Sequence, residues 1–103
     1  MENIREREVV PGFNGRFIHS AHMTVAYWRI KAGATIPVHN HIHEMIVNVI
    51  EGQLELTING ETKALDARMV GIIPSNVPHT AKGGTDCFVN DVFSPVREDY
   101  KLK

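Results

Sequence analysis

Three histidines at alternate positions, His39, His41 and His43, give residues 37–45 the clearest chemical character in this sequence. In an extended segment, alternate side chains leave the same face of the chain, so the three imidazoles would converge. Neutral imidazole is the commonest nitrogen ligand for divalent transition metals in proteins. A single histidine is more often a core or surface residue, but this spacing and the distant His79 favour a metal site.

A second group of candidate site residues lies near the end of the sequence: Asp91, Phe93 and Arg97. In the expected strand 86–93, Asp91 lies on the same face as the apolar residues at alternate positions. If that face lines a barrel, it places a carboxylate in an apolar cavity. Burial and a nearby charge tune a carboxyl group for proton transfer. Arg97 offers a planar guanidinium that can bind a carboxylate, and Phe93 offers an apolar wall. The alternative interpretation is that Asp91 only pairs with Arg97 or Arg29 at the rim.

Short strands separated by turns must position these residues, because no stretch of the sequence favours a helix convincingly. Asn59-Gly60 predicts a two-residue hairpin, and Asn14-Gly15 predicts a tight turn. Residues 61–68 could form a helical turn, but they lie between strands and are interpreted as a strand remnant and a turn. The expected strands cover residues 16–19, 23–30, 45–50, 53–58, 70–73, 78–81 and 86–93. This pattern predicts an all-β sandwich or small barrel.

The length of 103 residues predicts a single domain, 1–103. Residues 1–8 are interpreted as a charged N-terminal arm, and residues 94–103 as a polar C-terminal tail. A core of this size is thin, so a bound metal or a partner subunit would help to stabilise it.

The charge balance and the single cysteine exclude several classes of protein. Eleven Lys and Arg against twelve Asp and Glu give a formal net charge of −1, and no basic stripe marks a nucleic-acid binder. Cys87 cannot form an intrachain disulfide, and the first eight residues are charged where a secretory signal would be apolar. With no apolar run near ~20 residues, the sequence predicts a cytoplasmic protein without a membrane partner.

A homodimer is expected from the apolar residues on outward faces. Ile46 and Ile50 share the outer face of one expected strand, and the strand around Trp28 is apolar on both sides. A small monomer cannot cover both surfaces, and large apolar faces are typical of obligate interfaces.

The motif around the histidines resembles the first motif of the cupin superfamily: Gly33, then His39-x-His41, then position 45, then Gly52. Residues 74–79, which read Pro-x-Asn-x-x-His, resemble the second motif. The resemblance spans residues 33–95 and implies a single-domain cupin, a conical antiparallel β-barrel of the jelly-roll type.

The resemblance implies that His39, His41 and His79 bind a metal ion. Cupins usually carry glutamate or glutamine where this sequence has Met45. A thioether is a soft and weak ligand, so the further ligand is open between Met45, water, His43 and Glu44, the last with the wrong parity for the inner face. The metal is a divalent transition metal whose identity among nickel, zinc, iron, copper and manganese the sequence does not resolve.

A narrower resemblance within the cupins is to the KdgF family of pectin-degradation proteins. It is carried by the His-x-His-x-His-Glu run and by residues 91–100, Asp-x-Phe-Ser-Pro-x-Arg-Glu-Asp-Tyr. The resemblance implies a sugar-acid substrate and an enzyme that converts cyclic 4,5-unsaturated uronates, released by polysaccharide lyases, into linear 4-deoxy-5-keto uronates. Asp91, Phe93 and Arg97 match the positions that form the active site beside the metal. The alternatives are a non-catalytic cupin that binds a small ligand or metal, and a cupin dioxygenase.

Overall fold

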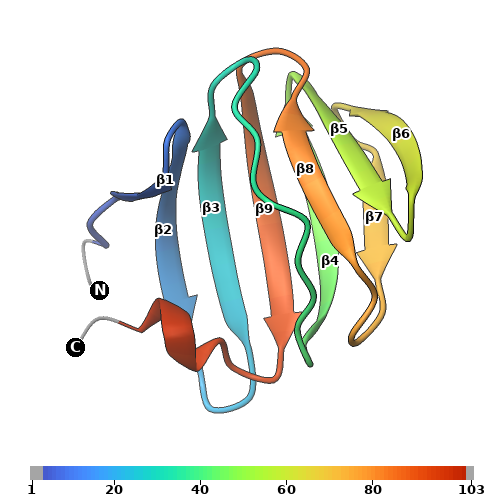
Figure 1. Cartoon of the computed structure of the whole chain (residues 1–103). Helices are drawn as coiled ribbons and strands as arrows, with labels where there is room; N and C mark the ends of the chain where they lie inside the picture. The colour runs from blue at the N-terminus through green and yellow to red at the C-terminus, as the bar shows by residue number, and fades with distance from the viewer. Residues whose placement is uncertain (1–3, 102–103) are drawn as a thin grey trace.

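The computed structural model describes residues 4–101, and within them the chain forms two antiparallel β-sheets (Figure 1). The all-β prediction is therefore confirmed. The elements are β1 (Arg7–Val10), β2 (Phe13–His19), β3 (Thr24–Ile30), β4 (Glu44–Glu51), β5 (Gln53–Ile58), β6 (Glu61–Asp66), β7 (Val70–Ile73), β8 (His79–Gly83), β9 (Cys87–Ser94) and the short 3-10 helix η1 (Glu98–Tyr100).

The larger sheet has the strand order β1-β2-β3-β9-β4-β7, and the smaller sheet has the order β6-β5-β8. β9 lies between β3 and β4, although both precede it in the sequence by many residues. Buried residues of both sheets form one hydrophobic core, so the sheets face each other as the two walls of a jelly-roll barrel.

Alternation with a period of two decides which side chains enter the barrel. On β9, Val89, Asp91 and Phe93 are buried, whereas Asn90 and Val92 between them are only half-buried. The expected inner face of this strand is therefore confirmed, and it carries a carboxylate into the core.

Trp28 on β3 also points inward, since only 6% of its surface is exposed. The outer face of β3 is therefore formed by the residues that alternate with it, Val25, Tyr27 and Arg29.

One local expectation from the sequence is wrong. The turn after β1 is formed by Pro11 and Gly12, where Gly12 has a φ of +82°, whereas Asn14-Gly15 lies inside β2. The strand and turn expected over residues 61–68 do form, but the strand is longer than a remnant: β6 covers residues 61–66, pairs with β5 along its whole length, and is followed by a turn at 67–68. The hairpin at Asn59-Gly60 forms as expected, with positive φ at both positions. A well-formed hairpin turn sets the register of both flanking strands, which explains why β6 is longer than its propensities indicate.

β1 and η1, the first and last elements of the described residues, lie near the same edge of the larger sheet (Figure 1). Arg7 of β1 donates a hydrogen bond to the main-chain carbonyl of Tyr100, and its guanidinium lies over the Phe17 ring at 4.7 Å from the centroid. Val96 and Arg97 are buried, within the segment interpreted from sequence as a polar tail. Residues 1–3 of the charged arm and 102–103 of the tail lie outside the described residues.

A row of aliphatic side chains crosses the outer face of the larger sheet. The strand register aligns Ile18, Val25, Val92, Ile46 and Ile72 on five neighbouring strands. Ile72 is 64% exposed and Ile46 is 43% exposed. Within residues 4–101, no helix is long and apolar enough to span a membrane.

Candidate metal centre

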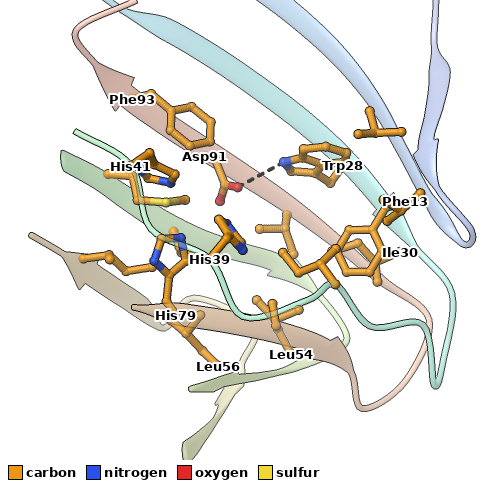
Figure 2. A pocket seen from close by; sticks show the side chains of 18 of the residues that line it. Phe13, Trp28, Ile30, His39, His41, Leu54, Leu56, His79, Asp91 and Phe93 are labelled. Atoms are coloured by element: carbon orange, nitrogen blue, oxygen red, sulfur yellow. Dashed lines mark hydrogen bonds between the residues drawn. The ribbon is translucent and has the colours of Figure 1, made fainter. Parts of the chain in front are cut away.

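The metal-ligand candidates are brought together by a main-chain bridge between the loop before β4 and the start of β8. His39 and His79 exchange two backbone hydrogen bonds of 3.0 and 2.9 Å, and the His41 ring packs against both. The ring centroids of His39 and His79 are 4.3 Å apart, and those of His41 and His79 are 4.8 Å apart. One potential ligand nitrogen from each ring lies within 4.8 Å of the other two. Figure 2 shows the three rings at one end of a cavity.

The hydrogen bonds of these rings leave the same nitrogen free in each. The Nδ1 atoms of His39, His41 and His79 lie 2.8, 2.9 and 2.8 Å from main-chain carbonyl oxygens two residues away. A carbonyl only accepts, so each neutral ring carries its proton on Nδ1 and has a lone pair on Nε2. The Nε2 atoms of His41 and His79 are buried without a partner among the described residues. This donor set fits a transition metal, because such bonds orient metal-binding histidines.

Burial keeps two of the rings uncharged. Loss of solvent lowers the pKa of His41 to about 4, and the charge of Arg97 adds to this effect. Burial also lowers the pKa of His79. Both rings are therefore neutral around pH 7, which is the protonation state that metal binding requires.

His43 does not join the other three histidines, so the expected convergence of His39, His41 and His43 is wrong in this respect. Residues 40–43 are irregular rather than extended, and β4 begins only at Glu44. The His43 ring donates from Nε2 to a main-chain carbonyl at 3.1 Å, and its own carbonyl accepts from His41. His43 therefore orients a neighbouring ring instead of adding a fourth.

Of the other candidates for a further ligand, one faces the cavity. Met45 is 5% exposed and lines it, whereas Glu44 is exposed on the opposite side of β4. As expected from the alternation along the strand, Met45 therefore faces the cavity and Glu44 faces away from it.

Asp91 lies in the same cavity, and the burial of its carboxyl group is nearly complete. Its Oδ2 accepts a hydrogen bond of 3.0 Å from the indole N–H of Trp28, and its Oδ1 is buried without a partner among the described residues (Figure 2). Burial raises the pKa of Asp91 to about 7, against the opposing effects of the Trp28 hydrogen bond and the Arg97 charge. A carboxyl with a pKa near neutrality can both accept and release a proton.

The alternative interpretation of Asp91 as an ion-pair residue is not supported. Within the described residues, Arg29 pairs with Glu6 at the surface, and Arg97 pairs with Asp99. Asp91 has no salt bridge in that part of the chain.

Arg97 is held by contacts on several sides. Its guanidinium lies over the rings of Phe93 and Tyr100, at 4.8 and 4.1 Å from their centroids. Its Nε and Nη2 donate to the two carboxylate oxygens of Asp99 at 3.0 and 2.7 Å. Its main-chain N–H donates to Thr24 Oγ1 at 2.9 Å. The arginine is therefore fixed at the edge of the cavity before any ligand binds.

Trp28 and Asp99, which orient Asp91 and Arg97, were not among the site residues expected from the sequence. Trp28 could have been found, because a buried indole N–H requires an acceptor and Asp91 lies on the neighbouring strand. Asp99 had a weaker signal, its position two residues after Arg97.

The cavity has a volume of about 270 Å³ and lies between the two sheets. Polar groups occupy one end of it, and aliphatic and aromatic side chains from both sheets line the remainder, among them Phe13, Ile30, Leu54 and Leu56.

Comparison with known proteins identifies the family. The family profile described as "Cupin domain" matches residues 26–91, more than half of the chain. The chain belongs to the cupin family. A search of curated proteins gives no match.

Two solved structures resemble the chain over nearly its whole length. One is an RmlC-like cupin from Shewanella frigidimarina, with 26% identity and a TM-score of 0.90, covering 95% of this chain and 89% of that chain. Another is KdgF from Halomonas sp., with 27% identity and a TM-score of 0.89, covering 94% of this chain and 91% of that chain. The protein is thus a small cupin that resembles KdgF.

A more distant likeness shows the fold alone. Oxalate decarboxylase from Bacillus subtilis, whose Mn(II) centres have been characterised, shares 20% identity with a TM-score of 0.81. The match covers 90% of this chain and 28% of that chain. Cupins of similar fold therefore include enzymes.

The first prediction concerns metal content. His41→Ala and His79→Ala should each lower the bound divalent metal at least ~10-fold, since each removes one of three nitrogen ligands. Elemental analysis of protein dialysed against a limiting amount of zinc or nickel measures this. His22→Ala, at an exposed histidine outside the cluster, is the control and should keep the wild-type content. Equal metal content in all the variants would contradict a site at the cluster.

The second prediction concerns Asp91 in protein freed of metal with a chelator. The native carboxyl keeps its proton to about pH 7, whereas the unfolded one loses it near its ordinary pKa of 3.8. Between these values the native state binds more protons, so the Asp91 contribution to stability falls as pH rises. Asp91→Asn should therefore match the wild type near pH 4 and exceed it at pH 8 by up to ~4 kcal/mol.

Urea unfolding at pH 4, 6 and 8 measures this difference, because all other titrating groups are common to both proteins. A variant less stable than the wild type at pH 8 would show that the ionised carboxylate is satisfied in the native protein.

Proposed function

We propose that this protein is a metal-dependent cupin enzyme that converts cyclic 4,5-unsaturated uronates into linear 4-deoxy-5-keto uronates, in the breakdown of pectin-type or alginate-type polysaccharides. The observation that carries the proposal is Asp91, a buried carboxyl without an ionic partner among the described residues, in one cavity with three histidines and Arg97. The likeness to KdgF from Halomonas sp. supports the substrate class.

The reaction is an isomerisation that needs a group able to move one proton. Removal of the proton from the C1 hydroxyl forms the C1 carbonyl and breaks the bond between C1 and the ring oxygen. The electrons pass through the ring oxygen and the C4–C5 double bond, so that C5 becomes a ketone and C4 takes up a proton. Asp91 is the group proposed to accept the first proton and to deliver one to C4, because its pKa of about 7 suits both steps.

The three histidines would hold the metal through their Nε2 atoms. When bound, a divalent cation supplies Lewis acidity toward substrate oxygens and a fixed point for orientation. His39, His41 and His79 border the same cavity as Asp91, so a substrate oriented from that end would lie within reach of the carboxyl group.

Arg97 and Phe93 are proposed to orient the substrate. The guanidinium would bind the substrate carboxylate at C6, a group that does not react, and the Phe93 ring would cover a face of the sugar. Both residues border the cavity. A non-catalytic binding cupin would have no need of an unpaired carboxyl in this position, since its burial costs stability.

The third prediction separates an enzyme from a binding protein. Asp91→Asn should lower kcat by roughly 10²–10⁴ with a small change in KM, as expected for loss of general acid–base catalysis. Arg97→Ala should instead raise KM, because it removes a contact that is the same in ground state and transition state. Loss of the ultraviolet absorbance of the conjugated double bond measures the rate, relative to spontaneous ring opening.

Asp66→Asn, the same chemical change at an exposed position, is the control. A wild-type protein with bound metal that leaves the spontaneous rate unchanged would refute this substrate class. An active Asp91→Asn variant would assign proton transfer to another group, of which Glu44, His43 and a water molecule are the first to test.

We also propose that two copies associate through the aliphatic row on the larger sheet. The row continues across five strands and includes Ile46, and Ile50 follows on the same strand face. Burial of such a face on association removes a large apolar surface from water.

The fourth prediction tests this association. Ile46→Lys should shift the protein toward monomer in sedimentation experiments at micromolar concentration, because a lysine at the centre of an apolar interface loses its hydration. Met23→Lys introduces the same charge at an exposed apolar residue outside the strands and should leave the association unchanged. A wild-type monomer under these conditions would contradict the proposal.

A further inference from the structure

Arg97 has an unusual environment for a residue proposed to bind a substrate carboxylate, since it already has one carboxylate partner. Only 7% of its surface is exposed, and its guanidinium forms two charge-assisted hydrogen bonds to Asp99. Asp99 itself is largely open to solvent, with 58% of its side chain exposed. Pairing with Arg97 lowers the pKa of Asp99, so its carboxylate is ionised over the neutral range.

The pairing uses one specific edge of the guanidinium. A guanidinium has five N–H groups in a planar fork. Asp99 accepts from Nε and from one N–H of Nη2, so the N–H groups that Asp99 does not use are the two of Nη1 and the second of Nη2, and the Tyr100 side chain interacts with this guanidinium as well. These remaining donors form the edge of the fork that can bind a second carboxylate with two hydrogen bonds. Arg97 borders the cavity, where such a ligand would lie.

Other contacts restrict the plane of the same group. Phe93 and Tyr100 both lie within 5 Å of the guanidinium carbon, measured to their ring centroids at 4.8 and 4.1 Å. Thr24 fixes the main chain of Arg97 at 2.9 Å. Arg7 binds the carbonyl of Tyr100 and so attaches this turn to the edge strand. Rings restrict the tilt of the guanidinium, but rotation within its plane needs a directional partner, and Asp99 provides that partner.

From this geometry we infer that Asp99 is a positioning residue that sets the orientation of Arg97, so that the free edge of the guanidinium selects a ligand with a carboxylate over its neutral ester. The inference rests on the proposed function insofar as the substrate is a uronate. It adds a determinant of specificity that does not touch the substrate.

The competing explanation is that Asp99 only neutralises a buried charge. In that case its removal would leave Arg97 in place with a stronger positive potential, and the preference for an acid would stay the same or increase. If Asp99 positions the arginine, its removal weakens the two-bond contact, because small displacements of an orienting group are costly. The two explanations predict opposite changes in the preference for the acid.

The fifth prediction uses Asp99→Asn and Asp99→Ala with two substrates, the 4,5-unsaturated uronate and its methyl ester. In both variants, the ratio of kcat/KM for the acid to kcat/KM for the ester should fall about tenfold, mainly through a higher KM for the acid, with kcat within about twofold of wild type. Asp99→Glu should restore part of the ratio. An unchanged or higher ratio in both variants would overturn the inference.

A matched control is available at the surface. Glu6 accepts two hydrogen bonds from Arg29 in the same bidentate manner, on residues that do not line the cavity. Glu6→Gln should leave the ratio at the wild-type value. A fall of equal size in this variant would indicate a general effect of lost charge and would count against the inference.

Equilibrium binding separates this inference from the reaction itself. Trp28 is the only tryptophan of the chain and borders the cavity, so its fluorescence can report the binding of galacturonate and of its methyl ester. If the wild type binds the acid more tightly and Asp99→Asn reduces that preference about tenfold, the inference holds even where no uronate is converted. If neither variant changes the preference, or the wild type has none, the inference fails even where the reaction is catalysed.

Discussion

Two main-chain hydrogen bonds between His39 and His79 join the loop before β4 to the first residue of β8. They continue a line of contacts in which the segment after β3 runs along β8, with Thr35 paired to Lys82 and Gly33 bonded to Gly83. β4 belongs to the larger sheet and β8 to the smaller one, so this segment closes one side of the barrel. The histidine cluster is a direct result of that closure, because its members lie where the two sheets are joined.

The polar end of the cavity is maintained against the hydrophobic effect that forms the rest of the fold. The carboxyl group of Asp91 is buried, and one hydrogen bond from Trp28 does not replace the solvation that it loses. Arg97 differs, because Asp99 and two aromatic rings compensate for its burial. A buried carboxyl such as that of Asp91 lowers the stability of the native state at neutral pH. Such a residue is retained most readily where its carboxyl takes part in the reaction.

The sequence was sufficient to predict the fold class and the inner faces of β4 and β9, because an alternation of two is a local property of the chain. It did not decide the inner face of β3, which is apolar on both sides. The side chains that border the cavity on β4 and β9, Met45, Asp91 and Phe93, follow from that alternation. The length of β6 did not follow, since the register of a hairpin depends on its partner strand. The irregular backbone at residues 40–43 did not follow either, nor did the hydrogen bond of His43 to a carbonyl of the C-terminal segment. The Trp28–Asp91 and Arg97–Asp99 contacts depend on exact side-chain directions, which sequence spacing alone does not give.

The central place of β9 in the larger sheet has a consequence for folding. Thr24 of β3 pairs with Phe93, and Val47 of β4 pairs with Asp91, so β9 separates two strands that both precede it in the chain. Until β9 inserts, β3 and β4 each present an unpaired edge, and contacts of such long sequence separation form slowly. The three histidines belong to segments that come before β9, whereas Asp91, Phe93 and Arg97 arrive with it or directly after it. The insertion of β9 therefore brings Asp91, the proposed proton-transfer group, into the site. The same step covers the open edges of β3 and β4, on which an incompletely folded chain would aggregate.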